Sequence, residues 1–133
     1  MKLKNLKQTV EFKGATPHDV YELIMDSKKH SAVTGDTAKL SRKVGAGFSA
    51  FSGWATGKNL ELVPDKKIVQ SWRGGDWPKG HFSQATFAFA KSKTGTKLTF
   101  TQTGIPEDQY EDIKHGWIDN YWEPMKRFLT NQK

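Results

Sequence analysis

Apolar and polar residues alternate at the start of the chain, and the pattern then changes to helical spacing. Residues 3–12 alternate as expected for a strand with one buried face. Two short helices are predicted next. Thr16 is a suitable N-cap, and Pro17 suits the first helical position. The second helix is predicted to have Ser27 as its cap and to end at Gly35.

A run of strands separated by turn residues fills the middle of the chain. Each segment is rich in alternating apolar positions and is bounded by glycine or by Pro64-Asp65. Because consecutive strands joined by short turns pair in antiparallel order, we expect a meander. The predicted strands are residues 37–44, 48–51, 54–63, 66–73, 82–91 and 97–103.

One long helix is predicted at the C-terminal end. Its apolar residues recur every three or four positions, which places them on one stripe. Gly116 costs about 1 kcal/mol relative to alanine inside a helix, so we expect the helix to approach the sheet closely there. Pro124 cannot donate a hydrogen bond to the Asn120 carbonyl, so we expect a kink. The stripe consists of Tyr110, Ile113, Trp117, Tyr121, Met125 and Phe128.

The order of these elements predicts an α+β fold. It is a curved antiparallel sheet wrapped around the long C-terminal helix, with two short helices after the first strand. One face of such a sheet must be covered, and the helix is expected to cover it and to leave an apolar cleft. With 133 residues the chain has the length of one domain. Residues 1–133 are therefore expected to form a single domain.

Composition limits the chemistry of this chain. Cysteine is absent, which excludes a disulfide scaffold, a cysteine-ligated zinc site and thiol catalysis. No apolar run approaches the roughly 20 residues of a membrane span, and the first ten residues lack the apolar segment of a secretory signal. We therefore expect a cytoplasmic location.

The net charge of +7 is unevenly distributed along the chain. Residues 1–106 contain 17 Lys/Arg and 8 Asp/Glu, whereas residues 107–133 contain 4 and 6. A basic protein suggests nucleic acid as a partner, because phosphate contacts depend on cations. Here the lysines are scattered, and no block of five or six like charges occurs. No specific nucleic-acid partner is expected.

The sequence contains no arrangement of residues typical of a catalytic site, so we do not expect an enzyme. Residues 45–50 match G-x-G-x-x-A, but a strand rather than a helix is predicted after them, so they form a hairpin turn. Asp76 and Glu61 border the aromatic face, although a turn or surface carboxylate is the simpler interpretation. The histidines lack metal-ligand spacing, so neither a metal nor another cofactor is expected. They are His18, His30, His81 and His115.

Three stretches of the chain resemble signatures of a known family, the one named for the activator of heat-shock protein 90 ATPase. The resemblance extends from about Thr9 to Leu129. The stretches are Leu62–Arg73, Asp76–Ser83, and Gly104–Glu107 followed by Gly116-Trp117 and Tyr121-Trp122. The family belongs to the START-like, helix-grip superfamily, whose members often hold an apolar ligand between the sheet and the long helix. The resemblance implies the same fold as the pattern of elements.

The resemblance implies two functions of different classes. The first is a non-enzymatic binding module that holds a small apolar or amphipathic ligand between the sheet and the C-terminal helix. The alternative is a stress-related co-chaperone domain that contacts a heat-shock 90-type chaperone and modulates its ATPase, as the similar second domain of two-domain activators does. Hydrolase or cyclase activity of distant START-like relatives is a weaker third option. A cavity of about 300 Å³ or more would favour the ligand, and a filled core would favour the surface role.

Aromatic residues supply the candidate sites. Trp77, in the loop before Pro78, and Trp122, which helical phase places off the apolar stripe, are the predicted partner surface. Trp122 has the alternative of packing under the N-terminal strand, and His81 is expected to be solvated. The stripe residues Trp117, Tyr121 and Met125 fit either ordinary core packing or a cavity wall. The predicted ligand-binding residues are Trp72, Phe87, Phe100, Trp117, Tyr121 and Met125.

Overall fold

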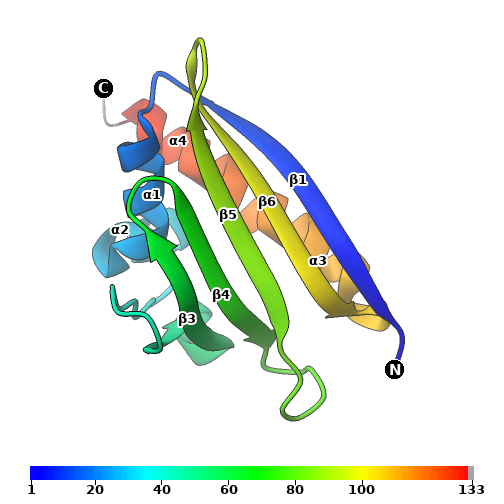
Figure 1. The fold of residues 1–133 in the computed structure, drawn as a ribbon. Helices are drawn as coiled ribbons and strands as arrows, with labels where there is room; N and C mark the ends of the chain where they lie inside the picture. Colours follow the sequence, from blue (N-terminus) through cyan, green and yellow to red (C-terminus); the bar gives the residue numbers. More distant parts are fainter. Residues whose placement is uncertain (132–133) are drawn as a thin grey trace.

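A six-stranded antiparallel sheet with helices on one face forms the framework of the computed structural model (Figure 1). The structure describes residues 1–131, so the last two residues of the predicted domain lie outside the described residues. The first strand pairs with the last, and two helices connect it to the opposite edge of the sheet. In sheet order the strands are β1 (Leu3–Lys13), β6 (Gly95–Pro106), β5 (Ser83–Lys91), β4 (Lys67–Gly74), β3 (Ala55–Val63) and β2 (Gly47–Ala50).

The first helix, α1 (Pro17–Met25), begins as the sequence predicts. The Thr16 hydroxyl accepts a hydrogen bond from the Asp19 backbone N–H at 3.1 Å. The Asp19 carboxylate accepts one from the Thr16 backbone N–H at 3.0 Å. This reciprocal pair is a capping box, and it satisfies two backbone donors that the helix itself leaves unpaired.

The second helix, α2 (Ser27–Thr34), ends at Gly35 as predicted, where φ is 80°. Its predicted N-cap was wrong by one residue. Asp26 has the extended backbone of a cap, and its carboxylate accepts a hydrogen bond from a backbone N–H of the first turn at 2.9 Å. Ser27 instead accepts a hydrogen bond from the Leu40 backbone N–H at 2.8 Å. The serine thereby fixes the following loop rather than the helix.

The predicted strand at residues 37–44 is wrong. Only Lys39 pairs with the sheet, in a single bridge to Ser49. The buried Asn59 side chain donates hydrogen bonds to two carbonyls farther along this segment, at 2.7 and 3.1 Å. Those carbonyls are satisfied by a side chain, so the segment needs no strand partner. The other predicted strands are confirmed, with β6 longer at both ends than expected.

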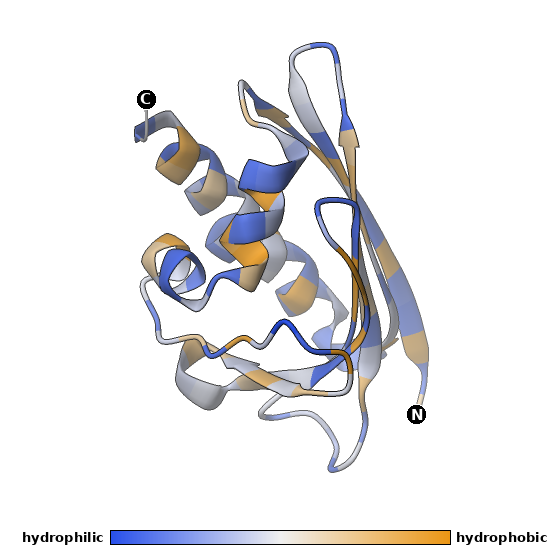
Figure 2. Cartoon of the chain, turned by 60° about the vertical axis from the view of Figure 1, so that its left-hand side comes forward, coloured by the Kyte–Doolittle hydropathy of each residue, from blue (hydrophilic) through white to orange (hydrophobic). Residues whose placement is uncertain are grey.

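The faces of the strands are as predicted. Hydrophobic and hydrophilic residues alternate along the strands (Figure 2), and the inward positions are almost fully buried. Phe87 and Phe100 lie opposite one another in the β5–β6 register, with their ring centroids 5.0 Å apart. This inward face forms the floor against which the helices pack (Figures 1 and 2).

The C-terminal helical segment crosses this face in three parts. They are α3 (Tyr110–Trp117), a π turn (Ile118–Trp122) and α4 (Glu123–Asn131), preceded by a short 3₁₀ turn (Glu107–Gln109). The irregularity of the helix is this π turn, in which the Glu123 N–H bonds to the Ile118 carbonyl five residues back. Pro124 lies after the π turn, at the start of α4, and the kink expected there stays a prediction. No helix among the described residues is long and apolar enough to cross a membrane.

The π turn accommodates one extra residue in the helix, and this changes which side chains face the sheet. Tyr121 and Trp122 are adjacent in sequence, yet both are buried. In a regular α-helix, neighbouring residues point about 100° apart. The wider turn lets both rings face inward, which a strict helical period does not predict.

Candidate functional site

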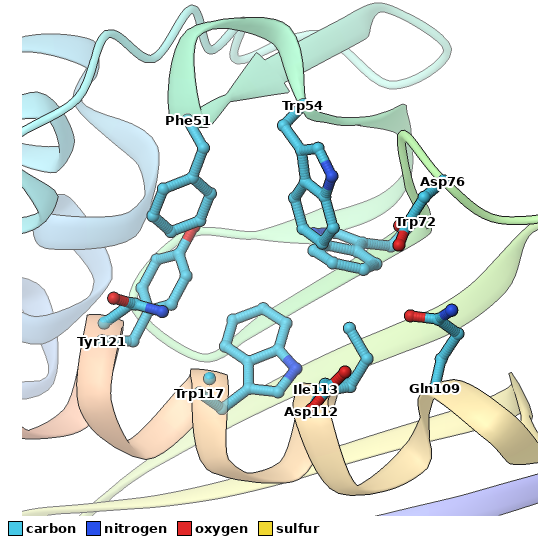
Figure 3. A pocket seen from close by; sticks show the side chains of 11 residues that line it. Phe51, Trp54, Trp72, Asp76, Gln109, Asp112, Ile113, Trp117 and Tyr121 are labelled. Carbon is cyan, nitrogen blue, oxygen red and sulfur yellow. The ribbon is translucent and has the colours of Figure 1, made fainter.

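A pocket of about 160 Å³ opens between the turn after β2 and helix α3 (Figure 3). This volume is below the roughly 300–1,000 Å³ of sites for drug-sized ligands. Of the six predicted ligand-binding residues, Trp72, Trp117 and Tyr121 line it. Phe87, Phe100 and Met125 do not, because they are buried in the core beneath it.

The turn after β2 brings two further rings to the pocket. Phe51 and Ser52 have left-handed backbones, with φ of 53° and 55°. This conformation is costly for residues other than glycine. The tight 3₁₀ turn (Phe51–Gly53) directs Phe51 and Trp54 toward the helix from the opposite wall, as Figure 3 shows. Sequence patterns missed both residues, because a turn of this kind interrupts the strand alternation.

Glycines at the end of β4 let Trp54 lie close to the backbone. A Cβ at Gly74 would stand 2.8 Å from atoms of the indole ring, and one at Gly75 would stand 3.1 Å away. Trp54 also packs edge-on against Trp72, with centroids 5.9 Å apart. The absence of side chains at these glycines therefore determines where one wall of the pocket stands.

A chain of buried hydrogen bonds fixes Trp117 in the opposite wall. Its indole N–H donates to the Gln102 amide oxygen at 2.7 Å. The Gln102 amide nitrogen donates to the Ser83 hydroxyl at 2.9 Å, and Ser83 donates to the Trp72 carbonyl at 2.8 Å. Gln102 is fully buried, so each of these bonds is costly to break. A glutamine at an inward strand position was the signal in the sequence for this network.

The hydroxyl of Tyr121 is held by His30, a buried residue outside the pocket lining. The His30 Nδ1–H donates to the Ile24 carbonyl at 3.0 Å, so its Nε2 accepts from the Tyr121 hydroxyl at 2.8 Å. Burial lowers the pKa of His30 below its ordinary value and raises the pKa of Tyr121. The Tyr121 wall of the pocket is therefore a protonated phenol that is paired with a neutral imidazole behind the lining. No local sequence pattern predicts this pairing of two residues that are 91 positions apart.

The rim of the pocket carries the polar groups. Asp76 and Asp112 reach it from the β4–β5 loop and from α3, and the amides of Gln109 and Asn120 complete it. Neither carboxylate forms an ion pair or a side-chain hydrogen bond with any residue that the structure describes. Glu61, the other carboxylate considered from sequence, lies outside the lining and pairs with Lys67 at 3.3 Å.

The prediction that Trp77 and Trp122 are exposed is wrong. Trp77 packs against Trp72, with centroids 5.4 Å apart, and its side chain is buried. Trp122 faces β1 through the π turn, and its indole N–H donates to the Gln8 amide oxygen at 2.7 Å. The alternative of packing under the N-terminal strand is confirmed. Neither ring is available at the surface as a partner contact.

Among residues 1–131, two other aromatic residues are the exposed ones. Trp54 is 41% exposed and Phe82 is 45% exposed. Phe82 lies beneath the Arg73 guanidinium, 5.9 Å from the ring centroid. His81, expected to be solvated, is half-buried, and its Nε2 contacts the Gly104 carbonyl at 2.8 Å. Within residues 1–131 no group of three or more potential ligands could hold a metal ion.

The chain matches a known protein family over most of its length. The family described as Activator of Hsp90 ATPase homolog 1-like protein matches residues 14–130. An activator of 90 kDa heat shock protein ATPase homolog from Dictyostelium discoideum is 36% identical over 128 residues, or 96% of this chain and 33% of that protein. Homolog 1 from Homo sapiens is 32% identical over 112 residues, or 84% of this chain and 33% of that protein.

A solved structure matches over a greater share of its own length. The crystal structure of an HSP90 activator from Plasmodium falciparum superposes with a TM-score of 0.83 at 26% sequence identity. The match covers 98% of this chain and 97% of that one. By contrast, the chain spans about a third of the length of the curated relatives it matches. The similarity thus concerns one region of the longer proteins and nearly the whole of the shorter one.

Proposed function

Since this chain belongs to the Activator of Hsp90 ATPase homolog 1-like family, we propose that it is a co-chaperone domain that binds an Hsp90-type chaperone and raises its ATPase activity. The observation that carries this proposal is the match over 97% of a chain described as an HSP90 activator. The chain with that description thus has nearly the same length and the same fold as this one. In the proposed role, the chaperone hydrolyses ATP and this chain contributes binding.

The size of the pocket supports this order of the two functions. At about 160 Å³ it is roughly half the volume that would favour a drug-sized ligand. The core beneath it is filled by large buried rings. A surface role needs no larger cavity, because protein interfaces are formed by patches of about 800 Å² per partner.

Two exposed aromatic residues support a position for the proposed chaperone contact. Trp54 contacts the glycines that end β4, and Phe82 contacts Arg73 in the same strand. Interface residues that contribute most to affinity are enriched in tryptophan and arginine. We propose that the end of the sheet formed by β4 and its following loop is the contact surface.

Steady-state ATP hydrolysis by a purified Hsp90-type chaperone, titrated with this chain, tests the proposal. We expect a saturable increase in the rate, and a reduced increase with Phe82→Ala. Leu60→Ala is the matched control, because Leu60 is 46% exposed but lies on β3. No increase in hydrolysis, together with no heat of binding by calorimetry, would overturn the co-chaperone proposal.

A second function is favoured by the ring-lined pocket itself. We propose that it holds a small ligand, since Trp72, Trp117 and Tyr121 converge on one opening (Figure 3). Native mass spectrometry of freshly purified protein, followed by titration of small amphipathic molecules against tryptophan fluorescence, tests this function. Added mass or a saturable change in fluorescence would support it. The absence of both added mass and a fluorescence change across the whole series would overturn it.

A further inference from the structure

We propose that the pocket between the turn after β2 and helix α3 binds an organic cation, a substituted ammonium group carrying a small apolar body. The inference rests on the second function proposed above, a small ligand in this pocket, and it gives that ligand a chemical class. It follows from three features of the pocket: its aromatic walls, its uncompensated carboxylates and its volume.

The walls are largely aromatic. Three indole rings, those of Trp54, Trp72 and Trp117, line the pocket together with the rings of Phe51 and Tyr121. Figure 3 shows the first wall descending from the turn after β2 and the second rising from the helix. The π electrons of such rings attract cations, most strongly for tryptophan, and rings around one small space are how proteins bind quaternary ammonium groups.

The charge at the rim has the sign that such a ligand requires. Asp76 lies beside Trp72 on the wall across from the helix in Figure 3, whereas Asp112 and Gln109 lie on the helix. No lysine, arginine or histidine occurs among the described residues of the lining. Two carboxylates without an ion-pair partner among residues 1–131 therefore border an apolar space. A cation entering that space gains both interactions, because neither carboxylate is already paired with a protein cation among the described residues.

The surrounding chain strengthens this local field. Residues 107–123, which include α3 and the π turn, contain six Asp or Glu and a single Lys. The remainder of the chain before residue 107 is strongly basic. The pocket is therefore set against the acidic element of a basic protein, and a fatty acid or other anion would meet repulsion there. The volume of about 160 Å³ further restricts the ligand to a small molecule or a single side chain.

Choline and its uncharged isostere 3,3-dimethylbutan-1-ol separate charge from shape. We expect choline to bind about tenfold more tightly than the alcohol in titrations followed by calorimetry, a ratio within the range of cation–π and carboxylate attraction. Equal affinity for the two would overturn the cation inference and leave a neutral small ligand in the pocket. If choline, the alcohol and n-butylammonium all fail to bind, the cation inference is overturned. The small-ligand series described above would then decide whether the pocket has a ligand function.

Variants identify the groups responsible. Asp112→Asn and Trp54→Leu are each expected to weaken choline binding several-fold. Asp112→Asn is expected to affect binding of the uncharged alcohol less than binding of choline. Asp119→Asn is the matched control, since Asp119 is an exposed carboxylate of the same helical segment outside the lining. An equal loss of choline affinity in Asp119→Asn would reduce the effect to general helix charge and overturn the assignment to this pocket.

The source of the cation is decided by a third probe. The n-butylammonium ion has the apolar stem and primary ammonium of a lysine side chain, whereas choline has a quaternary head. Tighter binding of n-butylammonium would assign the pocket to a lysine presented by a protein partner. Tighter binding of choline would assign it to a free quaternary ammonium compound. Either outcome supports the organic cation.

Discussion

Two buried hydrogen-bonding residues determine how the rings stand around the pocket. Gln102 holds the indole of Trp117, and His30 holds the hydroxyl of Tyr121. Both residues are almost fully buried. Buried polar groups of this kind are costly to leave unpaired, so they favour a single arrangement of the groups that they contact. The pocket walls are therefore preorganised by residues outside the lining.

Trp117→Ala is expected to reduce the free energy of unfolding by about 3–5 kcal/mol, because the ring is buried and its loss leaves a cavity. Trp117→Phe keeps most of the ring but removes the donor to Gln102, and we expect a cost of about 1–3 kcal/mol. Denaturant unfolding of both variants measures these changes. An alanine variant as stable as the parent would show that the helix does not pack on the sheet as described.

His30 makes stability depend on pH. Its folded-state pKa is lowered by burial, so the unfolded chain binds a proton at a pH where the folded protein does not. Stability from this group is complete above the unfolded pKa of about 6.5 and is lost as the pH falls toward the folded pKa. His30→Gln is expected to be less stable at pH 8 and to show a flatter decline below pH 7.

His18 provides the matched control when the free energy of unfolding is measured by denaturant titration as a function of pH. It is exposed and lies 2.9 Å from Asp65, and hydrogen bonding to that carboxylate raises the pKa of His18. The pH dependence of its contribution to stability is therefore opposite to that of His30. The stabilisation by His18 is present at low pH and is lost as the pH rises through the folded-state pKa. A decline below pH 7 that His30→Gln leaves unchanged would show that other groups cause it.

At the scale of elements, the sequence predicts regular structure well and local exceptions poorly. The alternation around Phe87 and the helical spacing of Trp117 place both residues correctly. Trp122 is misplaced because the π turn departs from the helical period that the prediction uses. Trp54 is missed as a pocket residue because a left-handed turn, rather than strand phase, directs it. Tertiary contacts, which no local pattern contains, decide such positions.

The close pairing of β3 and β4 gives an element-scale prediction. A Cβ at Gly57 would collide with the Ser71 carbonyl on the neighbouring strand, whose backbone cannot move away easily. We expect Gly57→Ala to lower the free energy of unfolding by about 1–3 kcal/mol or more. Gly47→Ala in β2 is the control, since its Cβ would meet the nearest atom at an ordinary 3.6 Å. Equal stability of the two variants in denaturant unfolding would contradict the described approach of the strands.

Over the whole molecule, one layer of helices covers one face of one sheet (Figure 1). The sequence predicts this arrangement from the order of its elements alone, because an antiparallel sheet with an apolar face requires a cover. It does not predict the size of the pocket or the chemistry of its rim. Those depend on Trp54, Asp76 and Asp112 meeting from three separate segments.

A single-domain chain implies one cooperative transition, and we propose this behaviour for residues 1–133. Far-ultraviolet circular dichroism reports the strands and helices, whereas tryptophan fluorescence reports the indole cluster around Trp72 and Trp117. We expect thermal unfolding curves from the two signals to coincide. Midpoints separated by several degrees would indicate that the helical layer unfolds apart from the sheet.

The π turn at residues 118–122 also has an evolutionary consequence. Because it accommodates an additional residue locally, loss of one residue there would restore a regular helix without turning α3 or α4 away from the sheet. The scaffold would persist, but only one inward ring would remain in place of Tyr121 and Trp122. A one-residue gap at this point in an alignment of relatives would thus mark lineages that share the architecture and differ either in their cavity wall or in their attachment to β1.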